Sequence, residues 1–328
     1  MAENLSLINL LKTALLFPGQ GSQYVGIGSA LYNAYPAAKE TYIEASDILG
    51  YDMAKLCFEG TSERLHQTEY TQPAILATSI ATWRALAMNT ESAVAVAGHS
   101  LGEYTALVVA EAISFRDALT VVAQRGRFMQ EAVPAGEGGM VAIVGLTGKE
   151  VEEICQTVSE VYPANYNAPD QIVIAGKEDG LKKAMEIASA KGAKRVIPIA
   201  VSVPSHSPLM RPACERLSAV LISVSGKDLK IPLVNNKDAK AITLWPEARA
   251  ALVSQLAYPL LWDQTIQTIR GMGADFFIEI GPSRVLSGLL KRMDRSLRVM
   301  NVESEEGVQK VNAWITSPLK KGDEGGFV

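Results

Sequence analysis

Short apolar runs alternate with longer amphipathic segments along this chain. The runs at 13–17, 93–97 and 276–280 have the length and composition of buried strands, and helical patterns lie between them. This alternation is typical of an α/β fold, in which helices cover both faces of a mainly parallel sheet. At 328 residues the chain is long enough to bury one large core or two smaller ones.

One region breaks this alternation. Its patterns predict, in order, a strand at 140–146, a helix at 149–158, strands at 164–167 and 171–175, a helix at 179–191 and a strand at 195–201. This β-α-β-β-α-β order is the ferredoxin-like pattern. We therefore predict a discontinuous α/β catalytic domain (1–132 and 205–316), a ferredoxin-like subdomain (133–204) and a disordered tail (317–328). A cleft between two such units is the expected place for a site.

A Gly-x-Ser-x-Gly motif, Gly98-His99-Ser100-Leu101-Gly102, follows the second apolar run and precedes a helix-like segment at 105–112. A sharp turn between strand and helix exposes the serine hydroxyl, and the first N–H groups of the helix point toward an oxyanion formed there. Ser100 is therefore predicted to be a nucleophile, which indicates acyl transfer or ester hydrolysis. The alternative is a chance match in a tight turn.

A serine nucleophile needs a base, and the chain has three histidines. His66 lies in a polar stretch and is expected at the surface. His99 adjoins Ser100, so its side chain points the other way and is expected to pack beneath the turn. His206 lies in a loop stiffened by Pro204 and Pro208 and is favoured by elimination. An ordinary loop histidine is the alternative.

A helix predicted at 114–133, with Ser114 and Asp117 as a capping box, places Arg125 on its apolar face and Arg127 on its solvated face. A buried arginine needs a counter-charge, because an unpaired interior charge costs several kcal/mol. Either an internal carboxylate forms an ion pair with Arg125, or a substrate supplies a carboxylate that the guanidinium binds with two hydrogen bonds.

The segment Gly19-Gln20-Gly21 follows the first apolar run. It is not a dinucleotide-binding fingerprint, because Tyr24 stands where that motif requires glycine. Gln20 lies at the carboxyl end of a predicted strand, where sites form in open α/β sheets, and is a candidate to hold an oxyanion. A plain strand–helix loop is the alternative.

Composition excludes several other classes of protein. The net charge of −4 gives no broad basic field, so we expect no nucleic-acid partner. The three cysteines are far apart and fit neither a disulfide framework nor a zinc site, which suits the cytoplasm. The apolar N-terminal stretch lacks the marks of a signal peptide and is expected to form a short helix. No run is apolar enough to span a bilayer, so we expect no membrane association.

Together with these residues, further motifs give the chain a resemblance to the malonyl-CoA:acyl carrier protein transacylase family of type II fatty acid synthesis. The similarity covers about residues 13–303. The motifs, in co-linear order, are Phe17 to Gln23, Thr71 to Ala74, Gly98 to Tyr104, Arg125 to Gln130, Asn165 to Asn167, Ser202 to His206, Val234 to Asn236, Gln255-Leu256 and Glu279 to Pro282. Ala257-Tyr258 departs from the usual family sequence at that place.

The resemblance implies a role for each matching residue. It makes Ser100 the nucleophile, His206 the base and Arg125 the residue that grips the malonyl carboxylate. It places the oxyanion between Gln20 and the backbone N–H of Leu101. The backbone carbonyl of Gln255 would orient the histidine. The implied fold is an α/β-hydrolase-like domain with an inserted ferredoxin-like subdomain.

The implied reaction is a ping-pong transfer of malonyl from malonyl-CoA to the phosphopantetheine thiol of acyl carrier protein. It requires no metal or redox cofactor, and we expect a monomer. Lys191, Lys194 and Arg195 are candidates for a basic rim that docks an acidic carrier protein. Three alternatives stay open: a free-standing acyltransferase that serves a polyketide synthase, a serine hydrolase that uses water as acceptor, and a non-enzymatic carrier-binding module.

Overall fold

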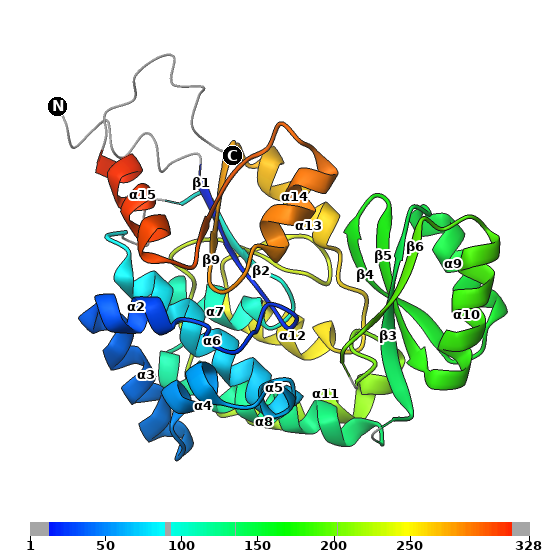
Figure 1. Ribbon diagram of the computed structural model, residues 1–328, viewed down its shortest axis with the longest axis horizontal. Coiled ribbons are helices and arrows are strands. Elements are labelled where there is room, and N and C mark those ends of the chain that lie inside the picture. Colours follow the sequence, from blue (N-terminus) through cyan, green and yellow to red (C-terminus); the bar gives the residue numbers. More distant parts are fainter. Residues whose placement is uncertain (1–12, 89–92, 135, 202, 317–328) are drawn as a thin grey trace.

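Two β-sheets, one mainly parallel and one antiparallel, organise the computed structural model (Figure 1). The structure describes residues 13–88, 93–134, 136–201 and 203–316. The predicted N-terminal helix and the tail predicted at 317–328 lie outside these ranges. The predicted α/β class, with a mainly parallel sheet and a second smaller unit, is confirmed.

The larger sheet has six strands in the order β10-β9-β1-β2-β7-β8. Their bounds are β1 Thr13–Phe17, β2 Ala95–Gly98, β7 Leu233–Val234, β8 Ala241–Ile242, β9 Phe276–Ile280 and β10 Arg298–Val302. All neighbours pair in parallel except β7 and β8. Every residue of β1 and β9 is buried, as expected for strands covered on both faces. The second predicted strand begins two residues later than its apolar run, at Ala95.

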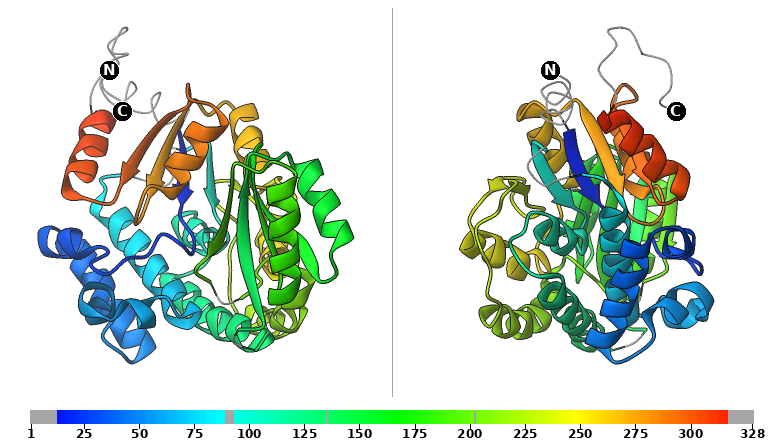
Figure 2. Two further views of the ribbon diagram at one scale, coloured as in Figure 1. Left: turned by 45° about the vertical axis from the view of Figure 1, so that its right-hand side comes forward. Right: turned by 90° about the vertical axis from the view of Figure 1, so that its left-hand side faces the viewer.

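Helices cover both faces of this sheet (Figure 2). Leu15 and Phe17 of β1 pack on one side with α6 (Thr68–Ala85), α7 (Gly102–Val109) and α8 (Phe115–Ala132). Ala14 and Leu16 pack on the other side with α13 (Trp262–Gly271) and α14 (Val285–Met293). The remaining helices are α2 Ser29–Ala34, α3 Pro36–Leu49, α4 Met53–Glu59, α5 Ser62–Leu65, the 3₁₀ turn η2 Pro208–Met210, α11 Arg211–Ile222, α12 Trp245–Gln255 and α15 Glu305–Thr316.

The smaller sheet is antiparallel, with strand order β4-β5-β3-β6. Its elements are β3 Gly138–Val144, α9 Gly148–Thr157, β4 Val161–Ala168, β5 Gln171–Lys177, α10 Glu178–Ala190 and β6 Arg195–Ile199. They follow one another in the predicted β-α-β-β-α-β order. Both helices pack against one face of the sheet, through a cluster that includes Ile143, Ile154 and Ala184. The division of the chain into domains at 133 and 204 stays a prediction.

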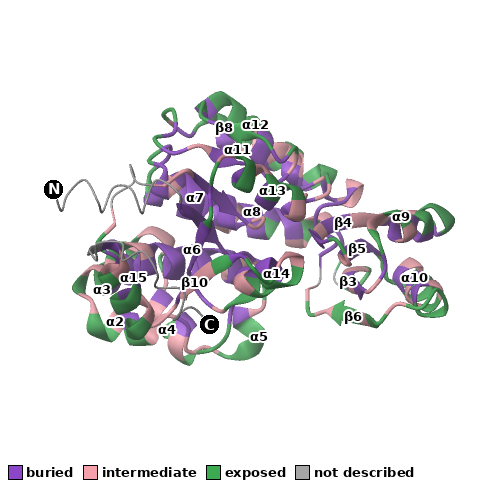
Figure 3. Ribbon diagram, turned by 90° about the horizontal axis from the view of Figure 1, so that it is seen from above, coloured by how far each residue is buried: buried purple, intermediate pink, exposed green. Residues whose placement is uncertain are grey.

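Main-chain hydrogen bonds tie the two units together. The Leu260 N–H donates to the Ala164 carbonyl and the Tyr166 N–H donates to the Leu260 carbonyl, each at 2.8 Å. Strand β4 of the smaller sheet therefore pairs with a segment that enters α13 of the larger unit. Figure 3 shows α7 buried at the centre of the molecule, while α9 and α10 expose their outer faces to solvent. Within the described residues, no helix has the length and apolar character needed to cross a membrane.

Candidate active site

Ser100 occupies a sharp turn between β2 and α7. Its φ of +53° lies in the left-handed region, which a non-glycine residue rarely adopts. A Cβ at Gly98 would overlap the main chain of Gly102, and a Cβ at Gly102 would overlap the carbonyl of Phe17. The two glycines of the motif therefore allow strand, turn and helix to pack closely enough to form the turn.

His206 faces Ser100 across the site. Its Nε2 lies 2.8 Å from the Ser100 Oγ, and its Nδ1 lies 2.8 Å from the backbone carbonyl of Gln255. A carbonyl only accepts, so Nδ1 carries the proton and Nε2 presents a lone pair to the serine hydroxyl. Burial, assisted by the nearby Arg125 charge, lowers the pKa of His206 to about 3. The imidazole is therefore neutral at neutral pH, as a general base must be.

Arg125 lies on the buried face of α8, whereas Arg127 is exposed, as the helical phase predicts. The Arg125 Nη2 donates to the Ser100 Oγ and to the Gln255 Oε1, both at 3.1 Å, and Nη1 donates to the Gln72 Oε1 at 2.7 Å. Its Nε–H is buried without a partner. None of the ion pairs among the described residues includes Arg125, so the predicted alternative of a direct internal ion pair is not seen there.

The start of α8 differs from the predicted capping box. The Ser114 hydroxyl accepts the Asp117 N–H at 3.0 Å, which is half of that motif. The Asp117 carboxylate, however, accepts from the Ser114 hydroxyl at 2.6 Å instead of from its backbone N–H. A complete capping box forms instead at α9, between Thr147 and Glu150.

Gln20 and Leu101 lie at the same edge of the larger sheet as Ser100, just beyond the carboxyl ends of β1 and β2. Phe17 is opposite Gly98 in the parallel pair β1–β2, so the segments that follow both strands lie together. The Gln20 Nε2 donates to the Thr68 Oγ1 at 3.2 Å. The Leu101 N–H stands at the start of α7, and no hydrogen bond found among the described residues uses it. It is therefore available to an oxyanion.

Two polar residues for which the sequence predicts no role complete the site. The Asn236 Oδ1 accepts the backbone N–H of Ser100 at 2.8 Å. The Glu103 carboxylate accepts the Asn236 N–H at 2.5 Å and the Gln255 Nε2 at 2.6 Å. Both residues fall within motifs that carry the family resemblance, but no spacing rule links them to Ser100. Burial raises the pKa of Glu103 to about 8.

The other two histidines lie outside the proton path. His99 packs edge-on against Trp262 at 5.3 Å between ring centroids, and its Nε2 lies 2.9 Å from the Asn167 Oδ1 of β4. It thus packs against the turn at Ser100, and its hydrogen bond links this turn, called the elbow below, to the smaller sheet. His66 is half-buried at the end of α5, where its Nδ1 lies 2.7 Å from the Ser62 carbonyl.

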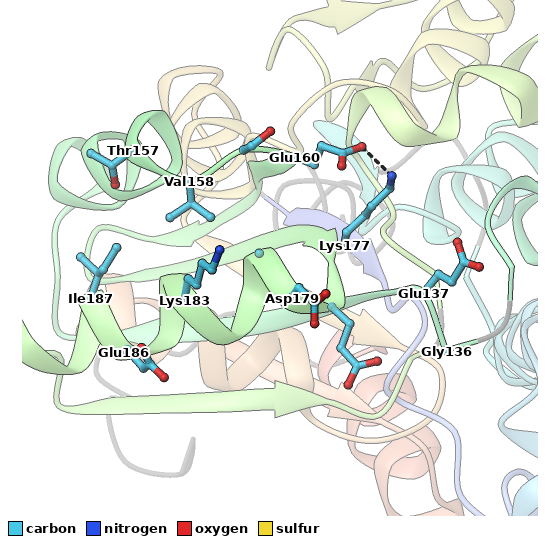
Figure 4. A pocket seen from close by; sticks show the side chains of 13 residues that line it. Gly136, Glu137, Thr157, Val158, Glu160, Lys177, Asp179, Lys183, Glu186 and Ile187 are labelled. Atoms are coloured by element: carbon cyan, nitrogen blue, oxygen red, sulfur yellow. Dashed lines mark ion pairs between the residues drawn. The ribbon is translucent and has the colours of Figure 1, made fainter.

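An open groove on the smaller unit lies apart from these residues (Figure 4). It runs between the start of α10 and the neighbouring ends of β4 and β5, and an ion pair of 2.9 Å joins Lys177 and Glu160 at its edge. No residue of the site described above lines it. Among the described residues, no group of three or more histidine, cysteine or acidic side chains is placed to hold a metal ion.

Several known proteins are similar to this chain in sequence and in fold. The model of the acyl transferase domain family matches residues 14–313. The malonyl CoA-acyl carrier protein transacylase of Bacillus subtilis is 44% identical over 302 residues, covering 91% of this chain and 95% of that protein. The transacylase structure from Coxiella burnetii is 40% identical with a TM-score of 0.89, covering 94% of this chain and 98% of the other.

A further structure is that of a malonyl transacylase in complex with its type II polyketide-synthase acyl carrier protein. It is 42% identical with a TM-score of 0.88, covering 91% of this chain and 98% of the other. Matches of this extent, over nearly the full length of both partners, establish common descent and not only a shared fold. The chain therefore belongs to the acyl transferase domain family, among the malonyl-CoA:acyl carrier protein transacylases.

Proposed function

We propose that this chain transfers malonyl from malonyl-CoA to the phosphopantetheine thiol of acyl carrier protein through a malonyl-Ser100 intermediate. The observation that carries the proposal is Arg125. The residue is 1% exposed, its guanidinium has no carboxylate partner among the described residues, and its Nη2 lies 3.1 Å from the Ser100 Oγ. A buried cation next to a nucleophile fits an acyl group that brings its own carboxylate.

The first half-reaction loads the serine. The His206 Nε2 takes the Ser100 hydroxyl proton as Oγ attacks the thioester carbonyl carbon. The C–S bond then breaks, and the CoA thiolate leaves with the proton that His206 returns. The Gln255 carbonyl keeps the proton of His206 on Nδ1 throughout and holds the ring in place.

The tetrahedral intermediate carries its negative charge on the former carbonyl oxygen. We assign its stabilisation to the Leu101 N–H and to Gln20, which lie at the same edge of the sheet as Ser100. In this assignment Gln20 exchanges its contact with Thr68 for the oxyanion. The loss of one such donor typically costs about 100- to 1,000-fold in rate.

The second half-reaction unloads the serine. The phosphopantetheine thiol gives its proton to His206 and its sulfur attacks the malonyl-serine ester. The Ser100 Oγ then leaves with the proton from His206, which restores the enzyme. Nucleophile, base and oxyanion donors all come from this chain, so the reaction requires no metal or redox cofactor, and we propose none. A monomer provides the complete set of residues.

The pathway that receives the product has two candidates. Fatty acid synthesis is the pathway that the family resemblance implies, and the structure of a relative with its polyketide-synthase carrier protein supports the second candidate. Carrier preference separates them, since both pathways would use the same catalytic residues. We expect the higher kcat/KM with the carrier protein of fatty acid synthesis.

One assay tests the proposed function against hydrolysis and against simple carrier binding. Purified protein is incubated with malonyl-CoA, with and without carrier protein, and malonyl-carrier and free malonate are quantified. We expect malonyl-carrier as the main product and little malonate in either arm. Free malonate as the main product would make the chain a hydrolase, and no turnover of malonyl-CoA would leave only a binding role.

A further inference from the structure

Glu103 has no part in the mechanism above, yet it lies at the centre of the hydrogen bonds around the catalytic groups. It stands three residues after Ser100 on α7 and is 1% exposed. None of the ion pairs among the described residues includes it. A buried carboxylate without a directly bonded cation is costly, so its presence calls for a compensating role.

The Oε2 atom of this carboxylate fixes the side-chain amide of Gln255. The Gln255 Nε2 donates to Glu103 at 2.6 Å and to the Ser100 carbonyl at 3.1 Å, while its Oε1 accepts from Arg125 at 3.1 Å. If the Gln255 amide were flipped, its NH₂ group would face the guanidinium and its oxygen would face two acceptors, so neither could form a hydrogen bond. Glu103 thereby keeps an oxygen pointing at Arg125.

This relay orients Arg125 without neutralising it. The side chains that accept from its guanidinium are all uncharged: the amides of Gln72 and Gln255 and the hydroxyl of Ser100. The Glu103 carboxyl group accepts from Gln255 and not from the guanidinium, so it does not neutralise Arg125 directly. A guanidinium held in this way is rigid and charged, and its direct counter-charge is left to the ligand.

The Oε1 atom of Glu103 stabilises the turn at Ser100 through Asn236. It accepts the backbone N–H of Asn236 at 2.5 Å, and the Asn236 side chain in turn accepts the Ser100 N–H at 2.8 Å. One carboxylate therefore connects the backbone that carries the nucleophile with the amide that carries the arginine.

We propose that Glu103 is a positioning residue for malonyl selectivity. Through Gln255 it sets the direction in which Arg125 meets the substrate carboxylate. Through Asn236 it fixes the backbone of Ser100 relative to that guanidinium. The inference rests on the proposed function, because it takes Arg125 as the residue that binds the malonyl group.

The test compares kcat/KM for malonyl-CoA and acetyl-CoA in wild type and Glu103→Gln. The substituted amide has the same shape, but its NH₂ group must face a donor on Asn236 or Gln255. A buried donor left without an acceptor costs about 10- to 100-fold. We expect the malonyl rate constant to fall by that factor, and the ratio of malonyl to acetyl to fall at least about tenfold.

Glu279→Gln is the matched control. Glu279 is also fully buried and accepts two backbone N–H groups, from Leu286 at 2.9 Å and Ser287 at 2.8 Å, but it shares no hydrogen bond with the site. We expect this control to lose stability with an unchanged malonyl/acetyl ratio. Thermal unfolding of each variant identifies the folded ones.

Equal loss of both substrates in a folded Glu103→Gln protein, or no loss at all, would overturn the inference, as would the same change of ratio in Glu279→Gln. If Glu103→Gln does not fold, Glu103→Asp replaces it; its shorter carboxylate cannot reach both donors, so a smaller fall in ratio is expected and an unchanged ratio would again overturn the inference.

Wild type and Arg125→Ala separate this result from the proposed function. A wild type without preference for malonyl would refute the proposed function itself. A preference that Arg125→Ala loses and Glu103→Gln keeps would refute only the role of Glu103.

Discussion

At the scale of single residues, Arg125 is buried on α8, whereas Arg127, two residues later, is exposed. The 3.6-residue period of α8 separates Arg125 from Arg127 before any contact is known. The period predicts that Arg125 is buried but not which groups its guanidinium contacts. The sequence therefore leaves open whether a protein carboxylate or a substrate carboxylate binds it. The structure favours the substrate, because within the described part of the chain the Arg125 N–H groups donate only to amide and hydroxyl oxygens.

Replacement of Arg125 by alanine should change specificity more than it changes chemistry. The malonyl carboxylate would lose its buried partner, and the expected fall in kcat/KM for malonyl-CoA is on the order of 10³-fold. Acetyl-CoA has no carboxylate, so its transfer should persist and gain in relative terms. Arg127→Ala on the exposed face of the same helix is the control and should leave both rate constants near wild type. An unchanged malonyl/acetyl ratio in Arg125→Ala would make this arginine structural.

His206 predicts how stability depends on pH. Its pKa is lowered to about 3 in the folded protein, against an ordinary value of roughly 6.5 in the unfolded chain. Below that value the unfolded chain binds a proton that the folded protein does not, so stability falls as pH decreases from about 6.5 toward 3.

Urea unfolding of wild type and His206→Gln at several pH values measures this effect. Between about pH 4 and 5.5 the free energy of unfolding of the variant should fall less steeply, by about 1.4 kcal/mol per pH unit. Ser100→Ala keeps the histidine and should keep the wild-type slope. Parallel slopes for wild type and His206→Gln would contradict the assigned pKa.

At the scale of elements, the turn between β2 and α7 depends on two glycines. Gly102→Ala would drive a Cβ into the Phe17 carbonyl of β1. Because Phe17 belongs to a central strand, the turn at Ser100 would have to move to remove this overlap. We expect a loss of stability of about 1–3 kcal/mol together with loss of transfer activity, measured by thermal unfolding and by the malonyl-carrier assay.

Gly288→Ala is the matched control for this prediction. Gly288 lies in α14, and a Cβ there would meet no atom within 4 Å. Alanine is the better helix former by about 1 kcal/mol, so this variant should be as stable as wild type or more so, and fully active. A Gly102→Ala protein with wild-type stability and activity would show that the elbow tolerates a side chain.

The elements with strong local patterns are the ones the sequence predicts well. Strands β1 and β9 are found at their predicted bounds, and the β-α-β-β-α-β order of the smaller unit is read from alternating patterns. Strands β7 and β8 have two residues each, too few to show a period. Strand β10 is largely half-exposed, so it has no continuous apolar run.

At the scale of the whole molecule, contacts between distant segments are what the sequence does not reveal. Ala164 and Tyr166 of β4 pair with Leu260, and Glu103 meets Asn236 and Gln255, although each pair is separated by about a hundred residues or more. No local pattern encodes such pairs, because they form only when the fold brings segments far apart in the sequence together. His206 is the instructive exception: with only three histidines in the chain, elimination replaces geometry.

The central claim is that malonyl resides on Ser100 between two thiols, and intact-protein mass spectrometry tests it most directly. Wild type mixed with malonyl-CoA should gain the mass of one malonyl group, which peptide mapping should place on Ser100. Addition of carrier protein with a free phosphopantetheine thiol should remove that mass and produce malonyl-carrier in equal amount, and Ser100→Ala should gain no mass. A malonyl adduct on Ser100→Ala, or malonyl-carrier formed by a wild type that never carries the adduct, would contradict the account.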